Sequence, residues 1–109
     1  MKFTINRQHL LSSIQEVSNA ISPRAAVVPI LTGMKLTMHN DILTLTGSNS
    51  DITIESTIPS RENEETIIKN MENGSIVLPV PHFPDIIRKL PGDQVEIEVK
   101  ENFKTIIKS

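Results

Sequence analysis

Three histidines are the first residues to consider for chemistry, because a histidine can act as a general base or bind a metal near neutral pH. His9, His39 and His82 are scattered along the 109-residue chain, and no two of them are three or four positions apart. The chain has no cysteine, which excludes thiolate metal sites and Cys nucleophiles. It also has no Gly-x-Ser-x-Gly elbow and no glycine-rich phosphate loop. We therefore expect no catalytic residue, no metal and no cofactor, and we interpret His9 as a helix-surface residue.

The composition fits one small domain with an aliphatic core. The chain is 38% hydrophobic and has three Phe, no Trp and no Tyr, so Ile, Leu and Val must fill the interior. Its formal net charge is −2, which is not the strongly basic balance of many nucleic-acid-binding domains. No signal peptide is visible, and the longest apolar run, 27–31, is interrupted by Pro29 and too short to span a membrane. A cytoplasmic protein is the simplest interpretation.

The spacing of apolar residues predicts two helices. The first follows Asn6, a good N-cap residue, and ends at Ser22-Pro23. Its apolar face consists of Leu10, Ile14, Val17 and Ile21. The second covers 81–90, with Pro84 in its first turn. The residues expected to share its apolar face are Phe83, Ile86, Ile87 and Leu90.

Alternation of apolar and polar residues predicts the strands around these helices. Strands are expected near residues 3–5, 34–38, 43–45, 52–58, 75–80, 95–99 and 103–108. The segments 24–29 and 60–65 are predicted to be loops, the second of them exposed and acidic.

The order of these elements repeats, and the repeat organises the chain. The first half has strand, helix and then three strands, whereas the second has strand, helix and only two strands. The fold class is therefore α+β, built from two β-α-β-β-β repeats with antiparallel sheets, of which the second lacks its last strand. Such a domain would have an unpaired edge, so we expect a piece of a longer chain. A natural small domain with an uneven repeat is the alternative.

Several segments, in the same order, resemble the start of the bacterial DNA polymerase III beta subunit family, the DNA sliding clamps. The resemblance begins with Met-Lys-Phe-Thr-Ile at 1–5 and continues with Pro-Ile-Leu-Thr-Gly at 29–33. It extends through Leu-Thr-Gly-Ser at 45–48 to Gly-Ser-Ile-Val-Leu-Pro at 74–79 and the helix segment 83–91. No single motif is diagnostic, but together the segments are highly specific and cover nearly the whole chain.

The resemblance implies a DNA-clamp fold, with both helices on the inner face of a ring and the sheets outside. Residues 1–109 would form the first of three clamp domains, truncated before its final strand, with the second and third domains outside the chain. Two full-length subunits would close head to tail around double-stranded DNA and tether the replicative polymerase for processive synthesis. DNA polymerase III and the clamp loader would bind domains not present here, and the protein would be cytoplasmic and associated with the nucleoid.

Such a ring would contact DNA weakly and without sequence preference, through Lys and Arg on phosphates. Most acidic residues lie on predicted strands or in the 60–65 loop, whereas Glu16 and Asp85 are the only acids on the helices. The basic candidates for DNA contact lie on or beside the helices: Arg7, Arg24, Arg88 and Lys89. The charge pattern alone fits a solvated mixture equally well, but the resemblance favours a positive inner face.

Arg24 is the strongest candidate, because it stands at a basic position of the family, although its loop is one residue longer than usual. Arg88 and Lys89 match a basic pair at the end of the second helix. His82 is included because the family often has Lys or Arg there. Arg7, at the start of the first helix, completes the set.

Two other classes of function are weighed against the clamp. An enzyme has no motif in its favour. A non-enzymatic, β-rich adaptor that docks proteins by an edge strand remains the alternative. It would need neither two further domains nor salt-dependent contact with DNA.

Overall fold

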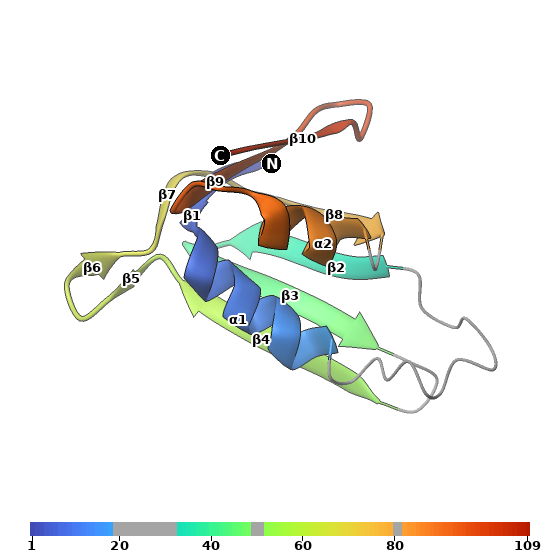
Figure 1. Cartoon of the computed structure of the whole chain (residues 1–109), viewed down its shortest axis with the longest axis horizontal. Coiled ribbons are helices and arrows are strands. Elements are labelled where there is room, and N and C mark those ends of the chain that lie inside the picture. Colours follow the sequence, from blue (N-terminus) through green and yellow to red (C-terminus); the bar gives the residue numbers. More distant parts are fainter. Residues whose placement is uncertain (19–32, 49–51, 80–81) are drawn as a thin grey trace.

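The computed structural model describes residues 1–18, 33–48, 52–79 and 82–109, which form two helices and ten strands (Figure 1). The first half contains β1 (Lys2–Asn6), α1 (Arg7–Ser18), β2 (Gly33–His39), β3 (Ile42–Ser48) and β4 (Thr53–Pro59). A small hairpin of β5 (Arg61–Glu62) and β6 (Glu65–Thr66) follows. The second half contains β7 (Ile68–Glu72), β8 (Gly74–Pro79), α2 (His82–Lys89), β9 (Gln94–Val99) and β10 (Thr105–Lys108).

The larger strands form two four-stranded antiparallel sheets. One sheet has the order β10-β9-β1-β7, and the other has the order β4-β3-β2-β8. The two halves of the chain exchange strands: β1 of the first half pairs with β9 and β7, and β8 of the second half pairs with β2. The predicted α+β class with antiparallel sheets is therefore confirmed, and the two repeats are interleaved.

One aliphatic core lies between the helices and the two sheets. The strands β1, β2 and β3 alternate buried and less buried residues, which is the pattern of a sheet with one covered face. The most central residues are fully buried apolar side chains from both sheets and both helices: Phe3, Ile5, Leu10, Met34, Leu36, Leu45, Ile87, Val95 and Ile97. Ile, Leu and Val make up most of the core, as the composition predicted.

Helix α1 begins where the sequence predicted. The backbone N–H of His9 donates to Asn6 Oδ1 at 3.1 Å, so Asn6 is the N-cap. Leu10, Ile14 and Val17 are buried, as the periodicity indicated. The predicted contribution of Ile21 and the end at Ser22-Pro23 lie outside the described residues.

The segment after β4 differs from the prediction. Residues 61–65 are exposed, as expected, and Ser60 is half-buried, but the segment is not a simple loop, because β5 and β6 pair across the turn Asn63-Glu64. Both turn residues have positive φ, 51° and 68°, as a two-residue hairpin of type I′ requires. The strand β7, which pairs with β1, has no counterpart in the prediction.

Candidate nucleic-acid interface

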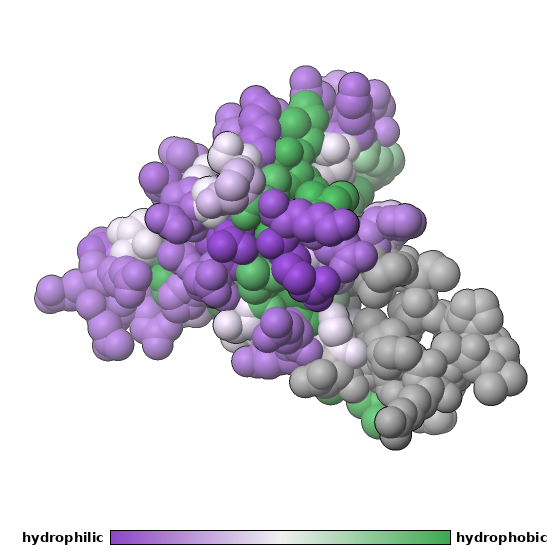
Figure 2. Space-filling model, in the orientation of Figure 1, coloured by the Kyte–Doolittle hydropathy of each residue, from purple (hydrophilic) through white to green (hydrophobic). Residues whose placement is uncertain are grey.

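The two helices lie beside each other on the same side of the sheets (Figure 1), and they contact each other. On α1 the residues turned away from the core are polar: Gln8, Ser12, Gln15 and Glu16 are exposed. Figure 2 shows that this face of the molecule is mostly hydrophilic over the helices. The helix pair therefore offers one polar surface built from both halves of the chain.

The positive charge of this surface gathers at the end of α2. Arg88 and Lys89 are both exposed in its last turn, where cations are favoured by the helix dipole. Arg88 forms an ion pair with Asp85, with Nη1 and Oδ1 2.9 Å apart, and the two side chains are 60% and 48% exposed. An exposed pair of this kind contributes at most about 1 kcal/mol, so the Arg88 guanidinium stays available to an anion.

Arg7 makes hydrogen bonds within the protein that its position at the start of a helix did not suggest. Its side chain is half-buried, and Nε–H donates to the carbonyl oxygen of Gly92 at 2.9 Å. Its backbone N–H donates to the carbonyl oxygen of Asp93 at 2.8 Å. The first residue of α1 is thus joined to the turn that follows α2.

Glu16, the acidic residue of α1, is hydrogen-bonded to a serine on β4. Ser56 Oγ on β4 lies 3.0 Å from Ser13 Oγ and 3.0 Å from Glu16 Oε2. Ser13 and Ser56 are buried polar residues within a contact that is otherwise apolar. The sequence analysis missed this group; its signal is a serine between Ile54 and Ile58 on the inward face of β4.

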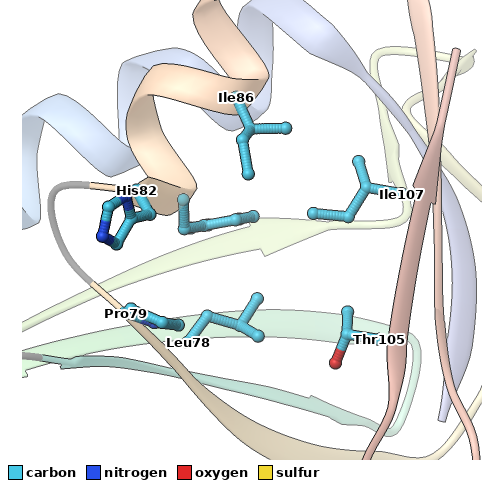
Figure 3. Close-up of a pocket in the computed structure, with 7 residues that line it drawn as sticks. Leu78, Pro79, His82, Ile86, Thr105 and Ile107 are labelled. Carbon is cyan, nitrogen blue, oxygen red and sulfur yellow. The ribbon is translucent and has the colours of Figure 1, made fainter.

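A shallow apolar pocket of about 180 Å³ lies between α2, β8 and β10 (Figure 3). Its lining residues are Leu78, Pro79, His82, Phe83, Ile86, Thr105 and Ile107. Ile86, predicted to share the apolar face of the helix, lines the pocket together with Phe83, but it is 44% exposed whereas Ile87 is fully buried. Successive helical residues are about 100° apart, and here Ile87 points to the core while Ile86 points into the pocket.

Apolar side chains are exposed outside the pocket as well, on the outer strands of the two sheets and beside them. Figure 2 shows a hydrophobic band over β9 and β10, beside α2. Val77 on β8 is 60% exposed, and β8 and β10 are each the outer strand of their sheet. Exposed apolar side chains next to unpaired strand edges are typical of a protein-binding surface.

His82, expected at the DNA surface, is the first residue of α2 and lines this pocket, at the end away from Thr105 and Ile107 (Figure 3). Arg24, the strongest candidate from the sequence, lies outside the described residues. Within the described ranges, no group of three or more His, Asp or Glu could hold a metal ion. No helix in the described part of the chain is long and apolar enough to cross a membrane.

Comparisons with known proteins point to one family. Residues 1–109 match the family described as "DNA polymerase III beta subunit, N-terminal domain". The beta sliding clamp of Bacillus subtilis (strain 168) is 47% identical over 109 residues, which are 100% of this chain and 29% of that protein. The chain therefore spans less than a third of the length of this relative.

Solved structures agree with the sequence match. The crystal structure of the DNA polymerase sliding clamp from Bacillus subtilis superposes with a TM-score of 0.90 at 47% identity, covering 100% of this chain and 28% of that one. The beta subunit from Streptococcus pyogenes gives a TM-score of 0.84 at 31% identity, again over 100% of this chain and 28% of that one. The similarity thus includes the sheets, the helices and their order.

Proposed function

Because the chain belongs to the DNA polymerase III beta subunit family, as its N-terminal domain, we propose that its full-length protein is a ring-shaped clamp that encircles duplex DNA. The observation that carries the proposal is the match of all 109 residues to that domain, with a TM-score of 0.90 to a sliding clamp. The ring would tether the replicative polymerase and do no chemistry on the DNA. Retention would come from topology, so each contact with DNA needs only to be weak.

The proposal includes two further clamp domains and a final strand of the first one. The relative from Bacillus subtilis is covered over only 29% of its length, which leaves room for further domains of this size. In the second sheet β4 lies outside β3, whereas the equivalent place outside β10 in the first sheet holds no strand of the described chain. A strand following Ser109 would fill that place.

The surface of α1 and α2 is proposed to face the DNA. Arg88 and Lys89 supply exposed charge at one end of this surface, and Arg24 is the sequence-based candidate beyond α1. His82, at the beginning of α2, stays in the proposed set, whereas Arg7, at the beginning of α1, already donates its Nε–H to the carbonyl oxygen of Gly92. Neutral residues dominate the exposed part of α1, which suits contact that must permit sliding.

The apolar pocket, together with the final strand proposed beside β10, is proposed as one side of the subunit contact that closes the ring. In a head-to-tail homodimer this surface meets a different surface of the second copy, outside these 109 residues. The support is the exposure of Ile86, which points into the pocket between the outer strands β8 and β10. DNA polymerase III and the clamp loader would bind the later domains, and the protein would act at the nucleoid in the cytoplasm.

Topological retention is the test of this proposal. The full-length protein, loaded by its clamp loader, is expected to stay on circular duplex DNA through gel filtration in high salt. It should be lost from linear duplex DNA, because a ring can slide off an end. Equal loss from both forms, with the loader active, would mean that no ring closes and would favour the adaptor function.

Removing the proposed phosphate contacts should lower the salt dependence of binding. In the full-length protein, Arg24→Ala is expected to reduce the slope of log K against log[salt] by about 0.9, and Arg88→Ala with Lys89→Ala by about twice that. Titrations of a labelled duplex at several salt concentrations measure the slope. The matched control is Lys35→Ala, an exposed lysine on β2 among buried Met34 and Leu36 and so on the outward face of its sheet. If the slope of Arg24→Ala equals that of the control, Arg24 does not contact phosphates.

A further inference from the structure

Two consecutive residues join four parts of the fold. The backbone N–H of Asn6 donates to the carbonyl oxygen of Ile67 at 3.0 Å, next to β7, and its side chain caps α1. Asn6 also pairs with Gln94 on β9. Arg7 adds the two bonds to Gly92 and Asp93, just after α2. The start of α1 is therefore fixed relative to the end of α2.

Arginine suits this position because its guanidinium can donate in two directions. The Nε–H donates sideways to Gly92 O, while the two terminal nitrogens carry four further N–H groups and share the positive charge. Lysine has its single charged nitrogen at the end of the side chain and no donor where Nε stands. A half-buried position strengthens the bond to Gly92, because less water competes for the carbonyl.

We propose that Arg7 is a positioning residue for the DNA-facing surface, and that it acts by holding α1 and α2 at a fixed relative orientation. The polar face of α1 and the basic end of α2 come from different halves of the chain, and they meet the DNA together only while the two helices keep their arrangement. This inference rests on the proposed clamp function and assigns one residue a role within it. Arg7 thereby acts through the helices rather than through a phosphate of its own.

The test compares Arg7→Ala and Arg7→Lys in the full-length protein, using a labelled duplex, a salt series and temperatures well below each melting transition. Both variants are expected to bind DNA about fivefold more weakly at fixed salt, the equivalent of one hydrogen bond, because the competent arrangement is less populated. The slope against salt should stay that of the unmodified protein. Arg7→Lys keeps the charge and serves as the decisive variant if Arg7→Ala does not fold.

Two outcomes would overturn the inference. A slope lowered by about one in Arg7→Ala, with affinity restored in Arg7→Lys, would make Arg7 a direct phosphate contact. Unchanged affinity in both variants would leave Arg7 without a part in DNA contact. If the unmodified protein itself shows no salt-dependent binding to duplex DNA, the proposed function fails, and that result is distinct from both.

Discussion

Replacing Ile86 with aspartate should keep the full-length protein from closing its ring while leaving the first domain folded. Ile86 is 44% exposed and points into the apolar pocket between α2, β8 and β10, so the fold itself tolerates a charge there. In the proposed subunit contact the same carboxylate would be buried without a partner, which costs several kcal/mol. We expect the dissociation constant of the dimer to rise by about 100-fold or more, measured by sedimentation velocity.

The chain provides a matched control for this experiment. Ile42 is 41% exposed and begins β3, which is separated from β8 by β2, and it lies outside the pocket lining. Ile42→Asp should therefore leave the dimer intact. If Ile86→Asp assembles as well as Ile42→Asp does, the pocket is not part of the ring contact.

Phe3→Ala is expected to destabilise the domain by about 3–5 kcal/mol. Phe3 has no exposed surface, and its strand β1 lies inside its sheet, between β9 and β7. Truncation would leave a cavity where strands from both halves of the chain meet. A loss of this size is a large part of the roughly 5–15 kcal/mol that stabilises a typical domain. Denaturant unfolding followed by circular dichroism measures it.

Phe103→Ala is the control, because it removes the same side chain from the surface. Phe103 is 74% exposed in the turn before β10, and surface substitutions usually change stability by less than about 0.5 kcal/mol. A small effect at Phe3, comparable to that at Phe103, would contradict the core described here.

The helices and most strands could be predicted because their burial is periodic. Asn6, Leu10, Ile14 and Val17 predicted α1 from its cap to its buried face. The strand β7 has no such pattern: Ile68 is its one fully buried residue, and Asn70 has a φ of 56°. The register of β7 against β1 also shifts between Lys2 and Thr4, so alternation is interrupted where it would be needed. Pairing to β1 stabilises β7, and no local pattern encodes that contact.

Only the charged residues of the candidate site could be predicted from the sequence. The basic end of α2 follows from the positions of Arg88 and Lys89 in the sequence, and the structure shows both exposed. The bond from Arg7 to Gly92 and the contact of Ser56 with Glu16 join residues 85 and 40 positions apart, and neither pair has a distinctive spacing. The pocket requires the same kind of long-range information, since α2, β8 and β10 meet there only after both sheets have formed.

The exchange of strands between the two halves also affects when the domain can fold during its synthesis. Strand β1 is translated well before β9, and the partner of Lys2 on β9 is Glu98. At about 5–20 residues per second, the strand that completes the neighbourhood of β1 is made roughly 5–20 seconds later. Until β9 is made, β1 lacks this pairing partner, and pairing over such long separations is slow. We therefore expect the nascent N-terminus to keep Phe3 and Ile5 accessible to chaperones until nearly all of these 109 residues have been translated.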